Sequence, residues 1–246
     1  MPAPAASYFV LSKSQRYSLT FALPLLVLYE VLALAIRNAS GGIRNGADVI
    51  LRTFFAAVAG ARGPLVFSAL IVAGLLAFAI RDMRRHPGSL KPRVFLLMLA
   101  ESSLLALAFG VVVGTITSKL VATAAPLALG PVDRVPFPVA LTVSLGAGLY
   151  EELLFRVILV GGLVLGGRRL LGLSARTASI LAVIAGALVF SAFHYVGEYG
   201  DTLTLRSFVF RAIAGVAFSG LYVVRGFGIV AWTHALYDVF LMAARG

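Results

Sequence analysis

The sequence contains no cysteine. Disulfide bonds, thiolate nucleophiles and cysteine-ligated zinc or iron–sulfur sites are therefore excluded for these residues. Charged residues are also scarce, at 13% of the chain, whereas soluble globular proteins carry about 25%. Acidic residues are the rarer sign, because ten Asp and Glu stand against 21 Lys and Arg and give a formal net charge of +11.

The residues that are abundant are apolar. They make up 60% of the chain, the mean hydropathy is +0.98, and they fall in long blocks. A helix that crosses a bilayer needs about 20 predominantly apolar residues. The sequence therefore predicts an all-α integral membrane protein, a polytopic transmembrane helix bundle of about seven to eight spans embedded in the lipid bilayer.

The apolar blocks define the expected spans, which are 17–36, 64–80, 94–114, 139–166, 177–193, 205–224 and 228–243. A shorter apolar stretch at 49–61 is expected to lie at the membrane interface. Residues 116–138 hold four of the ten prolines and are expected to form a loop or a short re-entrant piece. We expect 1–16 to be a cytoplasmic tail and 17–246 to be a single membrane domain.

The basic residues mostly flank the apolar blocks. With the N-terminus inside, the loops assigned to the cytoplasm carry eleven Lys and Arg and the opposite side carries seven. This bias agrees with the positive-inside rule, and such residues also contact anionic lipid. We therefore expect no nucleic acid partner, and the short loops favour the bacterial cytoplasmic membrane as the location.

Ionisable side chains inside apolar blocks indicate function, because a charge at the centre of a bilayer costs roughly 2.5–3.5 kcal/mol. Ten such residues lie in or beside the expected spans, and most of them gather in short clusters in the C-terminal half. The ten are Glu30, Glu101, Glu151, Glu152, Arg156, His194, Arg206, Arg211, His234 and Asp238.

The first cluster is Glu151, Glu152 and Arg156. Glu152 and Arg156 are four residues apart, a spacing that suits an ion pair on one helix face. Glu151 lies about 100° around the helix and cannot share that partner equally. A free carboxylate in a low-dielectric site can act as a general base toward water. The alternative is a helix held by a purely structural salt bridge.

Two further clusters contain the histidines. His194 follows Phe190 by four residues at the end of one span, and Asp238 follows His234 by four residues in the last span. Singly, these histidines could be a polar cap and a buried His–Asp hydrogen bond between helices. Together, polar groups on three spans must converge to be neutralised in lipid. We therefore expect a water-containing site between the C-terminal helices.

The motifs Glu151-Glu152-x-x-x-Arg156, Phe190-x-x-x-His194 and His234-x-x-x-Asp238 follow one another on separate apolar spans. In this order they resemble the CAAX-protease and bacteriocin-processing (CPBP, or Abi) family of intramembrane proteases, which includes the Ras-converting type of prenyl-protein endopeptidase. The resemblance covers a catalytic core of about residues 139–243. Many members have Asn at the position of Asp238.

The resemblance implies hydrolysis of a peptide bond near the membrane face. Glu151 and His194 are expected to hold and activate a water molecule. His234, with Asp238, is expected to polarise the substrate carbonyl or to stabilise the oxyanion that develops on it. Because an ionised Asp accepts hydrogen bonds and Asn can donate them, Asp238 needs a proton to serve as an oxyanion donor.

Glu152 and Arg156 are expected to orient this site. We prefer no cofactor, although Glu, two His and Asp are also able to bind zinc. The expected substrate is a membrane-associated protein or peptide, either prenylated and CAAX-like or one involved in peptide maturation or bacteriocin self-immunity. The alternative function is a non-catalytic membrane scaffold or a transporter with an intramembrane polar cluster.

Other intramembrane protease signatures are incomplete. The His-Glu-x-x-His pair of zinc proteases is absent, and Tyr237-Asp238 is not followed by the Gly-x-Gly-Asp of presenilin-like proteases. The stretch 217–220 with His234 approaches the rhomboid pattern, but a rhomboid places a further span between serine and histidine. None of these classes explains the three clusters together.

Overall fold

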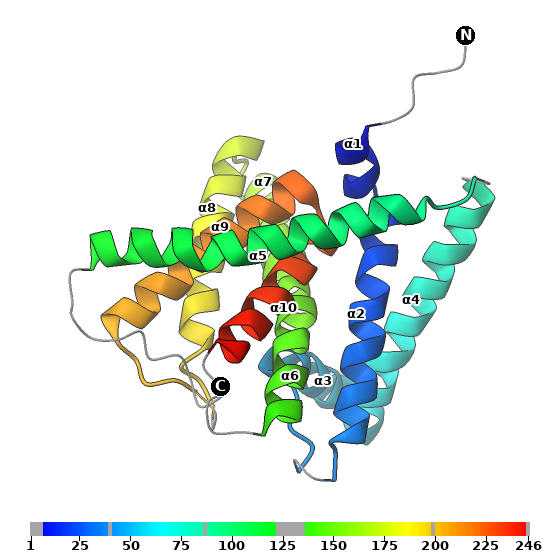
Figure 1. The fold of residues 1–246 in the computed structure, drawn as a ribbon, viewed down its shortest axis with the longest axis horizontal. Helices are drawn as coiled ribbons and strands as arrows, with labels where there is room; N and C mark the ends of the chain where they lie inside the picture. The colour runs from blue at the N-terminus through cyan, green and yellow to red at the C-terminus, as the bar shows by residue number, and fades with distance from the viewer. Residues whose placement is uncertain (1–6, 39–40, 86–87, 122–135, 198–199, 245–246) are drawn as a thin grey trace.

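The structure is a computed structural model that describes residues 7–38, 41–85, 88–121, 136–197 and 200–244. Across these residues all regular structure is helical and no strand occurs. The prediction of an all-α protein is therefore confirmed. Figure 1 shows the helices arranged as one bundle, with the long helix α5 running across it.

The described helices are α1 (Tyr8–Lys13), α2 (Gln15–Ala35), α3 (Gly46–Ala59), η1 (Gly60–Arg62), α4 (Gly63–Arg85), α5 (Pro92–Leu120), α6 (Phe137–Gly146), η3 (Ala147–Val160), α7 (Gly161–Leu170), α8 (Ala175–Phe193), α9 (Leu205–Arg225) and α10 (Phe227–Ala243).

Five helical segments within the described residues are long and apolar enough to cross a membrane. They are Gln15–Ala35, Gly46–Arg85, Pro92–Leu120, Ala175–Phe193 and Leu205–Arg225. Helix α10 is apolar but shorter. The predicted helical membrane bundle is therefore confirmed, and the chain is an integral membrane protein.

The helix bounds match most expected spans closely and differ in three places. The apolar stretch at 49–61 is helical and runs through η1 into α4. A Cβ added at Gly63 would lie 2.2 Å from the carbonyl oxygen of Phe55, so the turn between α3 and α4 packs closely. Helix α5 continues beyond the expected end at 114 to Leu120. Residues 122–135 of the expected loop lie outside the described residues, and its last two residues already belong to the helix that begins at Phe137.

The expected span at 139–166 is divided among α6, η3 and α7, which follow one another without a break. The middle part, η3, is a π-helix of 14 residues. Its wider turn, with bonds from residue i to i+5, is rare and occurs frequently at functional sites. The hydrophobic pattern does not predict this change of helix type, and η3 carries the first predicted cluster.

Helix α10 lies at the centre of the bundle. It packs against α2, α5, α6, η3 and α9, and Figure 1 shows α5 crossing it. The contact with η3 is close, because a Cβ added at Gly148 would lie 2.3 Å from the carbonyl oxygen of Ala231. Small residues at such a contact let two helix backbones approach in a membrane protein. The packing therefore brings the last predicted cluster against the first.

Candidate active site

The six predicted site residues gather where η3, the end of α8 and α10 meet. Glu151, Glu152 and Arg156 lie on η3, His194 directly follows α8, and His234 and Asp238 lie on α10. The contacts described below connect all six. The predicted convergence of three separate parts of the chain is therefore present in the fold.

Glu152 joins the first cluster to the last. Its Oε1 lies 3.1 Å from Nη1 of Arg156 and 2.6 Å from Nδ1 of His234. The Glu152 side chain has no exposed surface, and Arg156 has 1%. The Glu152–Arg156 pair expected from the spacing is thus present, and the same carboxylate also orients a histidine.

Aromatic rings enclose the Arg156 guanidinium. Its central carbon lies 4.4 Å from the ring centre of Phe190 and 5.4 Å from that of Phe218, within the range of a cation–π interaction. The Phe218 ring also stacks on His234, with centres 4.3 Å apart and planes 22° apart. Sequence reasoning did not select Phe218, since a phenylalanine in an apolar span carries no distinguishing signal.

Glu151 has a different environment from Glu152. Its Oε1 accepts a hydrogen bond of 2.9 Å from Nδ2 of Asn45. Its Oε2 is buried, has no hydrogen-bond partner among the described residues, and lies 3.9 Å from Nε2 of His194. A separation of 3.9 Å is too long for a direct hydrogen bond. One oxygen of Glu151 is therefore held and the other is available.

His194 presents Nε2 to this available oxygen. Its Nδ1 lies 2.9 Å from the carbonyl oxygen of Phe190. A carbonyl only accepts hydrogen bonds, so Nδ1 is the donor and the neutral ring keeps its lone pair on Nε2. The carbonyl of His194 in turn accepts from the backbone N–H of Asp201 at 2.8 Å, and the Asp201 carboxylate pairs with Arg211. The segment after α8 is thereby tied to α9.

His234 and Asp238 differ from the arrangement that their spacing suggests. Nε2 of His234 lies 3.8 Å from Oδ2 of Asp238, whereas its Nδ1 lies only 2.6 Å from Glu152. The close carboxylate partner of His234 therefore comes from η3 rather than from its own helix. The second ring nitrogen remains directed toward Asp238 without a hydrogen bond.

The other ionisable residues singled out in the sequence form separate contacts. Glu30 pairs with Arg44 and Arg52, Glu101 pairs with Arg225, Arg211 pairs with Asp201, and Arg206 lies 3.4 Å from the Ser118 hydroxyl.

Glu101 shows what one of these contacts does. It accepts a hydrogen bond of 2.5 Å from the Tyr8 hydroxyl, which links α1 to α5. Burial raises the pKa of Tyr8 to about 12, and the neighbouring Glu101 acts in the same direction. Tyr8 is therefore a neutral donor at physiological pH, and the contact holds helices together.

A zinc ion needs three or four closely spaced protein ligands. Within the described residues no group of three or more His, Asp or Glu side chains is arranged to hold a metal ion. This arrangement does not fit a zinc site.

The rhomboid-like stretch has an ordinary structural role. The Ser219 hydroxyl donates a hydrogen bond of 2.8 Å to the carbonyl of Gly215 in its own helix, and the side chain is buried. Such bonds satisfy a hydroxyl within a membrane helix. Ser219 is therefore not aligned as a nucleophile.

Comparison with known families finds a match for the part of the chain that carries these residues. Residues 133–240 match the family model described as Type II CAAX prenyl endopeptidase Rce1-like, and all six predicted site residues fall inside that range. Searches of curated proteins and of solved structures found no match. The match agrees with the family that the three motifs indicate and supports it: residues 133–240 are similar to the Rce1-like family of CAAX prenyl endopeptidases.

Proposed function

We propose that the protein is an intramembrane endopeptidase that hydrolyses a peptide bond with a water molecule activated by Glu151. The observation that carries the proposal is the asymmetry of this buried carboxylate. One oxygen is held by Asn45, and the other has no hydrogen-bond partner among the described residues and faces His194. A buried polar atom left without a partner needs a reason, and a bound water supplies one.

The water is placed between Oε2 of Glu151 and Nε2 of His194. Both atoms accept hydrogen bonds, so the water donates both hydrogens and keeps a lone pair for attack. As its oxygen bonds to the carbonyl carbon, Glu151 takes one proton and the carbonyl oxygen becomes an oxyanion. The C–N bond then breaks, and the proton passes from Glu151 to the departing amine.

His234 is assigned to the oxyanion. Glu152 holds Nδ1, which leaves Nε2 as the ring atom available to a substrate oxygen. In the imidazolium form Nε2 donates a hydrogen bond, and Asp238 at 3.8 Å supports the positive charge. One donor of this kind contributes about 10²–10³ in rate in other hydrolases.

Arg156 and Glu152 act as positioning residues. The guanidinium fixes one carboxylate next to His234 while Phe190 and Phe218 cover it. A shift of about 1 Å in a reacting group reduces rates by roughly 10²-fold. The buried pair therefore keeps His234 in register with Glu151.

The family name supports a proposal for the substrate class. It describes a CAAX prenyl endopeptidase, so we propose that this chain cleaves a membrane-associated protein or peptide with a CAAX-like C-terminus. We further propose that the protein lies in the bacterial cytoplasmic membrane, a location that its short loops favour. A scaffold or transporter would not need a glutamate with one oxygen held by Asn45 and the other facing His194.

The test uses purified full-length protein in detergent and a fluorogenic peptide that ends in farnesyl-cysteine followed by three residues. We expect release of the last three residues by the wild type and no release by Glu151→Gln at an unchanged melting temperature. Arg168→Gln is the matched control, because Arg168 is exposed on α7. Cleavage by Glu151→Gln at the wild-type rate would reject Glu151 as the base.

A further inference from the structure

Asn45 connects the N-terminal half of the chain to the site. It precedes α3, is 2% exposed, and lies outside the residues that match the family model. Its Oδ1 accepts a hydrogen bond of 2.9 Å from the backbone N–H of Ala47, which caps α3. Its Nδ2 donates the 2.9 Å bond to Oε1 of Glu151. Both ends of one amide are thus in use.

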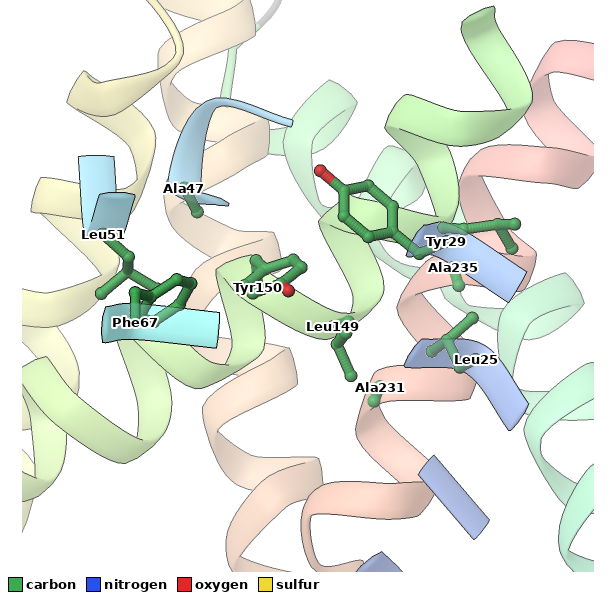
Figure 2. Close-up of a cluster of buried hydrophobic side chains, with 10 residues drawn as sticks. Leu25, Tyr29, Ala47, Leu51, Phe67, Leu149, Tyr150, Ala231 and Ala235 are labelled. Atoms are coloured by element: carbon green, nitrogen blue, oxygen red, sulfur yellow. The ribbon is translucent and has the colours of Figure 1, made fainter. Parts of the chain in front are cut away.

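The backbone of Asn45 is held as well. Its N–H donates to the Tyr29 hydroxyl at 3.2 Å, and that hydroxyl donates to Asp48 at 2.8 Å. The Tyr29 ring meets the Tyr150 ring edge to face, with centres 5.1 Å apart. Figure 2 labels both side chains in the cluster of buried residues. Tyr150 directly precedes Glu151 and donates to Oε1 of Glu30 at 2.8 Å. The two neighbours on η3 are therefore both bonded to the N-terminal half.

Two arginines neutralise the acids of this region. Arg44 lies 2.7 Å from Glu30 and also pairs with Asp48, while Arg52 lies 3.1 Å from Glu30 and 2.7 Å from Asp48. Burial alone would lower the pKa of Arg44, but the hydrogen bonds and ion pairs with Glu30 and Asp48 raise it. Each of these four charged side chains has a partner of opposite charge, so together they support the position of Asn45.

Gly146 permits the contact between this region and the helix that carries Glu151. A Cβ at that position would lie 2.5 Å from Cε2 of Tyr29 and 2.6 Å from Cβ of Asn45. Only a residue without a side chain fits there. The close approach of α6 and η3 to Asn45 therefore depends on the glycine at position 146.

We infer that Asn45 is a positioning residue for Glu151, holding Oε1 so that Oε2 faces His194 and the attacking water. The inference rests on the proposed function. A carboxylate turns readily about its last torsion, and a hydrogen bond to an ionised group is stronger than one between neutral groups. The N–H donor on Nδ2 of Asn45 therefore determines which oxygen of Glu151 is free.

The experiment compares Asn45→Ser and Asn45→Asp in the full-length protein with the farnesylated peptide. Both residues cap a helix about as well as Asn, so α3 is retained in each. Serine removes the donor, and aspartate keeps the shape but places a second carboxylate against Glu151. We expect kcat to fall about 10- to 100-fold for serine, as for loss of a hydrogen bond to a charged group, and further for aspartate. KM should stay unchanged.

The order of the two variants distinguishes positioning from capping. A capping role alone predicts that aspartate is tolerated at least as well as serine, and that result would overturn the inference. Wild-type kcat in both variants would overturn it too. Asn38→Ala, at an exposed asparagine shortly before α3, is the control and should leave kcat unchanged. If Glu151→Gln is inactive while Asn45→Ser is fully active, only this inference fails, whereas an active Glu151→Gln rejects the proposed function itself.

Discussion

Two groups of charged side chains, one partly exposed and one buried, lie side by side in this membrane protein and differ in how their charges are paired. In the N-terminal group, Glu30 and Asp48 each contact both Arg44 and Arg52. In the C-terminal group, Glu151, Glu152 and Asp238 share a single arginine and two histidines.

The two groups also differ in whether they contain buried atoms that lack a hydrogen-bond partner. Oε2 of Glu151, Oε2 of Glu152 and the guanidinium nitrogens of Arg156 are buried without hydrogen-bond partners, and no atom of the four-charge N-terminal group is in this state. A fully satisfied polar network makes a structure rigid, and a partly satisfied one is costly unless it is used. We therefore interpret the first group as structural support and the second as the proposed site for a water and a substrate.

The largest expected effect comes from removing the free carboxylate. Glu151→Ala should lower kcat by about 10²–10⁴-fold, the usual contribution of a general base, while the protein still inserts and purifies in a folded state. Turnover of the farnesylated peptide and the melting temperature in detergent check this. A variant that keeps most of the turnover would show that the unpaired oxygen has no catalytic use.

The buried pair beside it should behave as a coupled unit. Arg156→Met leaves Glu152 without its arginine and should destabilise the protein by about 3–5 kcal/mol. The double variant Glu152→Gln/Arg156→Met should be milder than the sum of the two single changes, because the residues are in contact. Thermal unfolding of all three variants measures the coupling. Strictly additive losses would mean that the pair contributes nothing jointly.

The spans and the six candidate site residues could be selected from the sequence for physical reasons. Apolar blocks of about 20 residues are visible as such, and ionisable side chains within them stand out because lipid makes them costly. Asn45 could not be found in this way. An asparagine before a helix indicates a cap, and its bond to Glu151 spans 106 residues of sequence. The π-helix η3 likewise follows from packing and not from a local pattern.

The contact between the two groups can be disturbed at Gly146. Gly146→Ala adds a Cβ against Tyr29 and Asn45, and such overpacking typically costs about 1–3 kcal/mol. We expect a lower melting temperature together with a reduced kcat, since the strain acts on the donor to Glu151. Gly162→Ala is the control, because a Cβ there meets no atom within 4 Å. If Gly146→Ala and Gly162→Ala have the same melting temperature and kcat, the N-terminal group does not influence the site.

A paired contact far from the site should give a smaller and purely structural effect. Glu101→Gln weakens the bonds to Arg225 and Tyr8 that join α5, α9 and α1. The expected loss is about 1–3 kcal/mol of stability, as for a hydrogen bond to a charged group, with kcat near the wild-type value at temperatures where the protein is folded. A fall in kcat without a change in melting temperature would contradict the division into support and site.

The smallest expected effect is that of metal removal. Zinc held by a protein needs closely spaced ligands, each fixed by a further partner, and the described residues provide no group of three that meets this need. Nε2 of His194 lies 3.9 Å from Oε2 of Glu151, a spacing that suits a bridging water. We therefore predict that activity survives ortho-phenanthroline and exhaustive chelation. Stoichiometric zinc by elemental analysis, with activity lost on stripping and restored by zinc, would reassign the histidines as ligands and leave one glutamate as the base.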